Sequence, residues 1–190
     1  MVRNLVRSFQ TSMIPSNIDK SWTLFLDRDG VINEKRENDY VKNWHEFSFI
    51  GGSLQAISSL SKVFGRIIIV TNQRGVGKGK MSENELLHIH QKMVEEIQIN
   101  SGRIDKIYYC TDVEDISECR KPNTEMGFQA LRDFPEINFE KSIIVGDSVS
   151  DIEFGQRLGM IKVFIGQGNF NFDLDGAFPS LYEFSLKFIS

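Results

Sequence analysis

Short apolar runs rich in β-branched and aromatic residues recur along the chain, and segments with helical spacing separate them. Their composition is typical of strands that are covered on both faces. Strand-sized runs that alternate with helices predict an α/β domain, and we expect a three-layer, doubly wound, mostly parallel sheet. The predicted strands are residues 23–26, 66–70, 104–109, 142–145 and 161–165.

Apolar residues three or four positions apart predict the helices between these strands. The first covers about residues 53–61. A clearer one begins at Ser82, where a glutamate three residues later gives the spacing of a capping box. A third follows Pro122, and a fourth spans roughly residues 150–158 and stops at Gly159.

The two ends of the chain are also amphipathic. In the tail, apolar residues at helical spacing predict a final helix that docks on the domain: Phe178, Leu181, Phe184 and Phe188. The first twenty residues combine an apolar face with arginines, a pattern shared by organelle-targeting segments. A short amphipathic helix or mobile arm is the favoured alternative. We therefore expect an arm over residues 1–20 and a single domain over residues 21–190.

Composition narrows the possible partners. The 190 residues are 41% hydrophobic and 25% charged, which is typical of a soluble globular protein, and the net charge is -4. An acidic balance argues against a nucleic-acid partner. The apolar runs are too short to span a membrane as helices. We expect a cytoplasmic protein, without membrane attachment, that is a monomer.

Cys110 and Cys119 are the only cysteines. Two cysteines nine positions apart are compatible with a disulfide, half of a metal site or two unrelated thiols. Nothing in the sequence marks a secreted protein, so reduced thiols are the favoured interpretation.

Polar residues that could take part in catalysis or binding follow three of the predicted strands and the long segment after another. Asp27 and Asp29 come directly after the first strand, and Thr71 and Asn72 after the second. Two cations, Arg120 and Lys121, end the long segment after the third strand. Asp147 and Asp151 follow the fourth strand. Because ligands bind at the carboxyl ends of strands in open parallel sheets, these groups are expected to meet at one edge.

Together these residue types predict phosphoryl transfer. Acids at several positions can hold a hard divalent cation, and Mg²⁺ suits a site that shares ligands with a phosphate. Cations and a hydroxyl can neutralise and orient a phosphoryl group. One carboxylate can attack phosphorus, and a second can exchange protons with the leaving group and with water.

The same residues resemble the four motifs of the haloacid dehalogenase (HAD) superfamily. Residues 25–33 are similar to the first motif, residues 70–73 to the second, residues 120–123 to the third and residues 146–151 to the fourth. The longer strings resemble the family that holds the D,D-heptose 1,7-bisphosphate phosphatases and the histidinol-phosphate phosphatases. The resemblance implies a HAD-like Rossmann-type fold without a large cap domain.

The resemblance also implies roles for individual residues. Asp27 would be the nucleophile and a magnesium ligand, and Asp29 the general acid and base, with its backbone carbonyl on the metal. Asp147 would complete the protein ligands of the metal. Thr71 and Lys121 would hold the phosphoryl oxygens. The supporting and substrate-binding residues would be Asp151, which orients Lys121 or metal-bound water, and Asn72, Arg74 and Arg120.

Many members of this family carry a zinc ion held by three cysteines and a histidine. Here Cys110 and Cys119 match two of those positions, while Asp112 and Ser117 stand at the other two. Structural zinc needs a full set of cysteine and histidine ligands, so no zinc is expected.

Three weaker signals were set aside. The glycine- and lysine-rich residues 74–80 do not have the spacing of a nucleotide P-loop, and we expect a flexible loop there. Contact of its basic residues with a second phosphate is left as an open alternative. His88 and His90 point in different directions on a helix, so we expect surface or boundary histidines. His45 lies in a long loop, where it is a possible substrate contact.

The favoured function is therefore a Mg²⁺-dependent phosphomonoesterase that works through an aspartyl phosphate on a small phosphorylated sugar. Heptose 1,7-bisphosphate is the first expected substrate and histidinol phosphate the second. A phospho-acceptor signalling domain is the alternative from another class. It is disfavoured because the acidic pair follows the first strand and because Asp29 would speed hydrolysis of the phosphoaspartate.

Overall fold

The computed structural model describes residues 14–167 and 173–189, and its centre is a six-stranded sheet in the order β3-β2-β1-β4-β5-β6. Every pair of neighbouring strands is parallel. The sequence predicted a mostly parallel sheet, and the described sheet is parallel throughout. The strands are β1 (Thr23–Leu26), β2 (Arg66–Asn72), β3 (Lys106–Cys110), β4 (Ser142–Gly146), β5 (Ile161–Ile165) and β6 (Gly176–Phe178).

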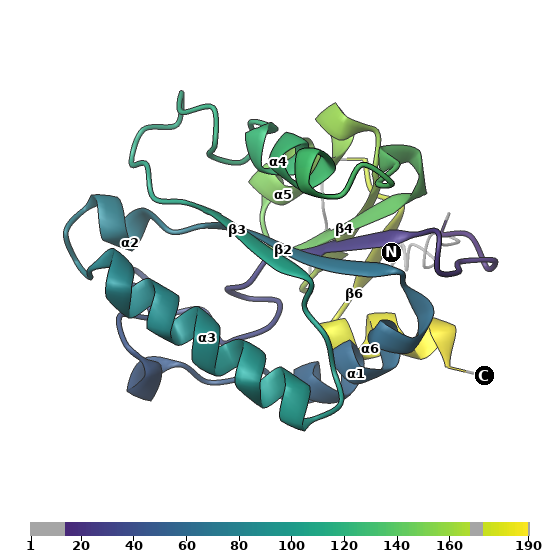
Figure 1. Ribbon diagram of the computed structural model, residues 1–190, viewed down its shortest axis with the longest axis horizontal. Helices are drawn as coiled ribbons and strands as arrows, with labels where there is room; N and C mark the ends of the chain where they lie inside the picture. Colours follow the sequence, from purple (N-terminus) through teal and green to yellow (C-terminus); the bar gives the residue numbers. More distant parts are fainter. Residues whose placement is uncertain (1–13, 168–172, 190) are drawn as a thin grey trace, which may run out of the picture.

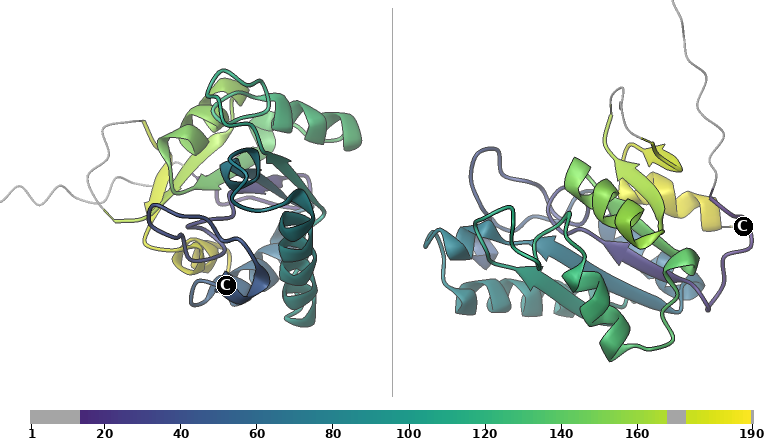
Figure 2. Two further views of the ribbon diagram at one scale, coloured as in Figure 1. Left: turned by 90° about the vertical axis from the view of Figure 1, so that its left-hand side faces the viewer. Right: turned by 90° about the horizontal axis from the view of Figure 1, so that it is seen from above.

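Helices cover both faces of the sheet and give three layers (Figure 1). One face carries α4 and α5, and the other carries α1, α3 and α6, as the turned views also show (Figure 2). The helices are α1 (Ser53–Val63), α2 (Arg74–Gly77), α3 (Glu83–Ile99), α4 (Glu125–Asp133), α5 (Val149–Leu158) and α6 (Leu181–Ser185), with short 3-10 turns at Trp44–Glu46, Phe139–Lys141 and Leu186–Phe188.

The alternation of side chains along each strand divides the core in two. In β1, Leu24 and Leu26 point into the cluster under α1, α3 and α6, while Phe25 points into the cluster under α4 and α5. All three side chains are fully buried. Burial on both faces explains why the strands are continuous apolar runs rather than alternating ones.

β1 lies at the point where the strand order reverses. Its last residue, Leu26, is in register with Ile69 of β2 on one side and with Val145 of β4 on the other. The carboxyl ends of β1, β2 and β4 therefore meet at one edge of the sheet, which is where ligands bind in this architecture. No segment between the described elements is large enough to form a cap domain.

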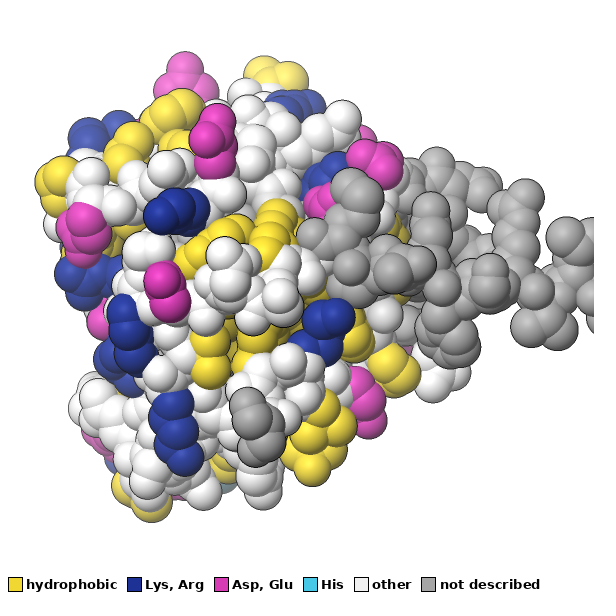
Figure 3. Space-filling model, turned by 90° about the vertical axis from the view of Figure 1, so that its right-hand side faces the viewer, with side chains coloured by type: hydrophobic (Ala, Val, Ile, Leu, Met, Phe, Trp, Pro, Cys, Tyr) yellow, Lys and Arg dark blue, Asp and Glu magenta, His cyan; other side chains and the backbone are white. Residues whose placement is uncertain are grey.

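The opposite edge is used for structural contacts. Figure 3 shows the end of the molecule where the strands begin, and acidic side chains are scattered there among basic and hydrophobic ones. Lys20 donates from its Nζ to the carbonyl oxygens of Ser61 and Phe64, 2.9 and 3.1 Å away. Arg103 Nη2 donates to the Gly65 oxygen at 2.9 Å. These cations satisfy carbonyls at and just beyond the end of α1.

Most of the elements predicted from the sequence are confirmed, including the capping box of Ser82 and Glu85 at the start of α3. Three differences stand out. The prediction that Phe178 belongs to the tail helix is wrong, because Phe178 lies in β6. The sequence did not predict this strand. The glycine-rich stretch expected to be a loop contains the short helix α2. Ile104 lies outside β3, which instead extends to Cys110.

The N-terminal arm is only partly described. Residues 1–13 lie outside the described residues, and so does any targeting segment there. Residues 14–20 have no helix or strand, and Ile14 is buried in the core cluster under α1, α3 and α6. None of the helices in the described ranges combines the length and apolar character needed to cross a bilayer.

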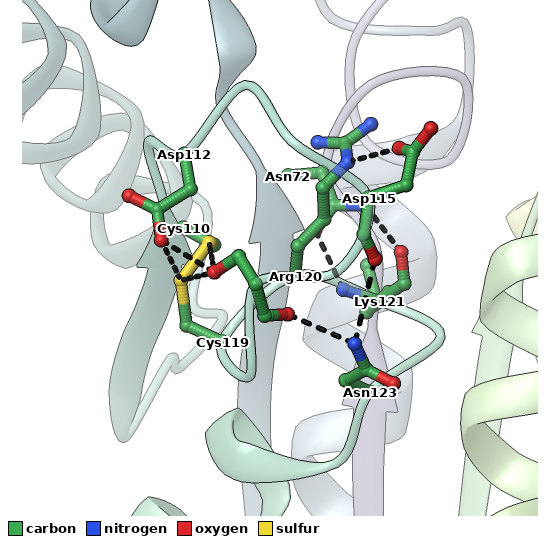
Figure 4. Close-up of a disulfide and its surroundings, with 9 residues drawn as sticks. Asn72, Cys110, Asp112, Asp115, Cys119, Arg120, Lys121 and Asn123 are labelled. Atoms are coloured by element: carbon green, nitrogen blue, oxygen red, sulfur yellow. Dashed lines mark hydrogen bonds and ion pairs between the residues drawn. A yellow bond between two sulfur atoms is a disulfide. The ribbon is translucent and has the colours of Figure 1, made fainter.

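The expectation of reduced thiols is wrong. Cys110 at the end of β3 and Cys119 form a disulfide, with Cα atoms 5.5 Å apart (Figure 4). The bond closes a loop of nine residue steps just before Lys121. Ser117 Oγ contacts the Cys119 sulfur at 3.3 Å and also hydrogen-bonds Asp112. In the chain-entropy description, a loop of this size is worth about 2–3 kcal/mol of stability.

Reduction of this disulfide is expected to lower the free energy of unfolding by about 2–3 kcal/mol, because the unfolded chain regains the freedom of the closed loop. Urea unfolding with and without reductant measures the change. Before reduction, an alkylating reagent should modify neither cysteine, which mass spectrometry measures. Cys119→Ser is the control, because reductant has no bond left to break in it. Equal stability of the wild-type protein with and without reductant would contradict the assignment.

Gly155 of α5 is required by the close approach of that helix to β4. A Cβ atom at this position would lie 2.2 Å from Cγ2 of the buried Ile144. Gly155→Ala is expected to cost about 1–3 kcal/mol through overpacking, which outweighs the gain of about 1 kcal/mol in helix propensity. Thermal or urea unfolding measures the loss. Gly51→Ala is the matched control, because an added Cβ there meets no atom within 4 Å.

Candidate active site

The predicted site residues meet at the carboxyl edge of the sheet. Asp27 continues the pairing of β1, because its amide donates to the Val145 oxygen at 2.9 Å. Thr71 and Asn72 are the last residues of β2, and Asp147 directly follows β4. Lys121 reaches the same edge from the loop that precedes α4. Four segments that are far apart in the sequence therefore supply one site.

Lys121 is the charged centre of this site. Its Nζ lies 2.9 Å from Asp27 Oδ1 and 2.5 Å from Asp151 Oδ1, and it donates to the Val70 carbonyl at 2.6 Å. Lys121 is 2% exposed and Asp151 is fully buried. An ammonium ion in such a place is tolerated only when carboxylates and hydrogen bonds replace its lost water.

The backbone of Lys121 is fixed by Asn72. Asn72 Nδ2 donates to the Lys121 oxygen at 3.1 Å, and the Lys121 amide donates to Asn72 Oδ1 at 3.0 Å. Both polar ends of the amide are engaged with the main chain of the residue that carries the ammonium group. The described contacts of Asn72 are thus positioning contacts, and its role in substrate binding stays a prediction.

Asp151 is held by the start of α5. The Ser148 amide and hydroxyl donate to Asp151 Oδ2 at 3.0 and 2.6 Å, while the other carboxylate oxygen faces Lys121. The capping arrangement of this helix thereby fixes the carboxylate that pairs with the lysine. Asp151 thus contacts Lys121 directly, and its role in orienting Lys121 or metal-bound water stays a prediction.

The pKa values of Asp27, Lys121 and Asp147 are all raised, for different reasons. Burial is the largest effect on Asp27, and together with the charges of Asp151 and Asp147 it outweighs Lys121 and raises the pKa of Asp27 to about 7. Burial lowers the pKa of Lys121, but the charges of Asp151 and Asp27 outweigh this effect and raise it overall. Burial raises the pKa of Asp147 against the hydrogen bond from Lys35. The site thus has an excess of acid groups that a cation can neutralise.

Asp29 is held differently from Asp27. Arg28 contacts both of its carboxylate oxygens, and Asn33 Nδ2 and Gln73 Nε2 each donate at 2.9 Å. Burial raises the pKa of Asp29, but the charge of Arg28 and these hydrogen bonds outweigh it and hold the pKa below its usual value. The side chain is 24% exposed, so one side of the carboxylate remains open to solvent or substrate.

Sequence reasoning missed the support behind Asp29. Arg28 is 1% exposed, and its Nη1 lies 3.2 Å from His90 Nε2. Burial and the charge of Arg28 lower the pKa of His90 to about 3, so the ring is neutral and its Nε2 accepts from Arg28. The expectation of a surface or boundary histidine is wrong for His90, which is 5% exposed. Its position one helical turn after the buried Leu86 was the available signal.

Gln73 and Lys35 are two further residues without a predicted role. Gln73 Nε2 donates to Thr71 Oγ1 as well as to Asp29, so it joins the ends of β2 and β1. The Thr71 hydroxyl accepts this bond and keeps its own proton for another acceptor. Lys35 Nζ lies 2.8 Å from Asp147 Oδ2. Lys35 comes from an irregular loop, where no periodicity indicates which way a side chain points.

The acid cluster suits a magnesium ion. Oxygen atoms of Asp27, Asp147 and Asp151 lie within 4.8 Å of one another. Asp147 Oδ1 is buried and has no hydrogen-bond partner among the described residues, as an unused metal ligand would. Asp151 is already engaged by Lys121 and Ser148, which leaves Asp27 and Asp147 as the better ligands. Hard carboxylate oxygens are the donors that Mg²⁺ prefers.

The turn after Asp29 approaches this cluster closely because residue 30 is glycine. Gly30 has φ +87°, a conformation that favours glycine. A Cβ atom there would lie 2.2 Å from Asp147 Oδ2. The backbone at Gly30 can therefore pack directly against the Asp147 side chain.

Arg74 and Arg120 lie together at the outer side of the site. Arg120 Nε lies 3.0 Å from Asp115 Oδ1 (Figure 4). Arg74 Nη2 contacts the same oxygen. The structure thus brings together the two arginines predicted to bind substrate. His45 lies in the 3-10 turn at Trp44–Glu46, and no described contact connects it with this cluster.

The sequence is similar to those of known HAD-type hydrolases. The family model for HAD-hydrolase-like proteins matches residues 118–179. The D-glycero-alpha-D-manno-heptose-1,7-bisphosphate 7-phosphatase of Mycobacterium bovis is 34% identical over 180 residues, which cover 92% of this chain and 95% of that protein. The D-glycero-beta-D-manno-heptose-1,7-bisphosphate 7-phosphatase of Vibrio cholerae is 34% identical over 154 residues, which cover 76% of this chain and 81% of that protein.

A solved structure is similar as well. The D,D-heptose 1,7-bisphosphate phosphatase from B. bronchiseptica, in complex with magnesium and phosphate, superposes with a TM-score of 0.80 and 27% identity. The match covers 87% of this chain and 97% of that one. On these similarities and on the four motifs that the fold gathers at one sheet edge, the chain belongs to the heptose-1,7-bisphosphate 7-phosphatase family of the HAD superfamily.

Proposed function

We propose that this protein is a Mg²⁺-dependent phosphomonoesterase that removes the 7-phosphate from D-glycero-D-manno-heptose 1,7-bisphosphate. The observation that carries the proposal is the position of Asp27, which shares a buried lysine with Asp151 and lies among oxygen ligands for a metal. The relatives' activity and the magnesium and phosphate bound by the similar structure support it.

In the first half of the reaction, a carboxylate oxygen of Asp27 attacks phosphorus and the bond to the sugar oxygen breaks. Asp29 gives its proton to that leaving oxygen. Its surroundings favour the carboxylate, so it gains this proton when the negative substrate phosphate is bound nearby and raises its pKa. Lys121 and the Thr71 hydroxyl bind the phosphoryl oxygens during the transfer.

In the second half, Asp29 takes a proton from water, and the water oxygen attacks phosphorus. The bond between phosphorus and Asp27 breaks, which releases phosphate and restores the carboxylate. Asp27, Asp147 and the backbone carbonyl of Asp29 would hold Mg²⁺, which supplies charge neutralisation at the phosphoryl group. The supports of Asp29, namely Arg28, Asn33 and Gln73, keep its carboxylate in one orientation throughout.

Histidinol phosphate is the weaker substrate candidate, because its remaining end carries an amine. The arginine pair of Arg74 and Arg120 suits a second anion instead. A signalling domain is disfavoured because Asp29, held beside the nucleophile's strand end, would hydrolyse the phosphoaspartate. We further propose a monomeric cytoplasmic enzyme without zinc, nucleic-acid or membrane partners. Cytosolic proteins seldom keep disulfides. The redox state of Cys110 and Cys119, measured by alkylation in intact cells, therefore tests the cytoplasmic location.

Phosphate release from a panel of sugar bisphosphates, sugar monophosphates and histidinol phosphate tests the proposal. We expect turnover that requires Mg²⁺, stops with EDTA and is fastest on heptose 1,7-bisphosphate. Asp27→Asn should be inactive while its unfolding curve remains cooperative, because the nucleophile is lost. Full activity in EDTA or in Asp27→Asn would overturn the mechanism, and preference for histidinol phosphate would replace the substrate.

Asn72→Ala tests the positioning of Lys121. We expect kcat to fall about 10- to 100-fold, because a catalytic group that shifts by about 1 Å loses activity on that scale. KM should change little. Asn123→Ala is the control, because Asn123 Nδ2 donates to the Ser117 oxygen at 2.9 Å and leaves Lys121 untouched. A rise in KM at unchanged kcat would instead show that Asn72 binds substrate.

A further inference from the structure

An exposed aspartate occupies the arginine pair in the described structure. Asp115 has a side chain that is 81% exposed, whereas those of Arg120 and Arg74 are 13% and 28% exposed. Both arginines contact the same oxygen of Asp115: Arg74 reaches it from the start of α2, and Arg120 from the loop before α4. A pair of sheltered cations is thus covered by one carboxylate that remains largely in water.

One carboxylate leaves this pair unsatisfied. Each guanidinium has five N–H donors in a fixed planar arrangement. Arg74 Nε and Arg120 Nη1 are buried and have no hydrogen-bond partner among the described residues. A phosphate group offers three oxygens and up to two negative charges, and it suits paired arginines better than one carboxylate oxygen does. The two arginines can therefore donate more hydrogen bonds than Asp115 accepts.

The pair is adjacent to the reaction centre. Arg120 directly precedes Lys121, and Arg74 follows Asn72 by two residues, so both come from the segments that carry the phosphoryl-binding groups. Consecutive Cα atoms are about 3.8 Å apart. The guanidinium group of Arg120 points to Asp115 while the ammonium group of Lys121 reaches Asp27. One bound molecule with two anionic groups can engage both positions.

The loop that carries Asp115 is held at both ends. The disulfide of Cys110 and Cys119 closes it, and Asn123 Nδ2 donates to the Ser117 oxygen at 2.9 Å. The Ser117 amide also donates to the Glu114 oxygen at 3.2 Å, which forms a turn around Asp115. These restraints keep Asp115 beside the arginines after another anion has replaced it.

We infer that Asp115 is an internal competitor for the arginine pair, which binds the second phosphate of the substrate. This rests on the proposed function. The substrate displaces Asp115 when it binds, and the monophosphate product still carries the phosphate held by Arg74 and Arg120. Asp115 then returns to the arginines and speeds the departure of the product. Asp115 is a residue that tunes affinity and takes no part in bond breaking.

Asp115→Asn tests the competition, because it keeps the shape of the side chain and removes its charge. Inorganic pyrophosphate is the probe for binding, measured by calorimetry, and a sugar monophosphate is the probe for product inhibition. Both are expected to bind about two- to five-fold more tightly, the affinity equivalent of one exposed ion pair. Glu114→Gln is the matched control, because it removes the same charge from the neighbouring exposed residue and should leave both constants unchanged.

A double-mutant cycle places the effect on the arginines. In an Arg74→Ala background the gain from Asp115→Asn should shrink, because part of the contested site is gone. Unchanged or weaker binding to Asp115→Asn, or an equal gain in Glu114→Gln, would overturn the inference. Pyrophosphate binding requires no turnover, so the inference can succeed if no sugar phosphate is hydrolysed. It can also fail in a fully active enzyme.

Discussion

The buried ammonium group of Lys121 is the interaction on which the site depends. It lies between the carboxylates of Asp27 and Asp151, and a backbone carbonyl takes its third proton. Removal of the ammonium group would leave two buried carboxylates without compensation, at a cost of about 3–5 kcal/mol. The loop, the strand and the helix that bring these groups together are therefore constrained jointly.

This requirement explains the local features around the site. Asn72 fixes the backbone of Lys121, and the capping arrangement of α5 fixes Asp151. A second network, from His90 through Arg28 to Asp29, fixes the other acid without touching the first. Two carboxylates on one turn thus receive opposite environments: burial among acids raises the pKa of Asp27, and an arginine with two amide donors lowers that of Asp29.

The main groups of the site could be predicted because each follows a strand and the parallel sheet brings strand ends to one edge. The supports were harder to predict. β6 has three residues, of which Phe178 alone is a strong strand former, and its helical spacing to Leu181 misled the prediction. Lys35 and the disulfide depend on the paths of irregular loops, which no periodicity reports. His90 was predictable in principle, since it falls on the buried stripe of α3.

The position of β1 between β2 and β4 also affects how the chain can be synthesised. Among the described strands, β1 is the first to leave the ribosome, yet one of its neighbours, β4, begins only at Ser142. Until then, one edge of this mostly apolar strand has no partner, and such edges are prone to pair with other chains. Long-range parallel pairing is also slow to form. A nascent chain that stalls before Ser142 would already contain Asp27 and Lys121, but it would expose this edge, which makes such fragments natural clients of chaperones.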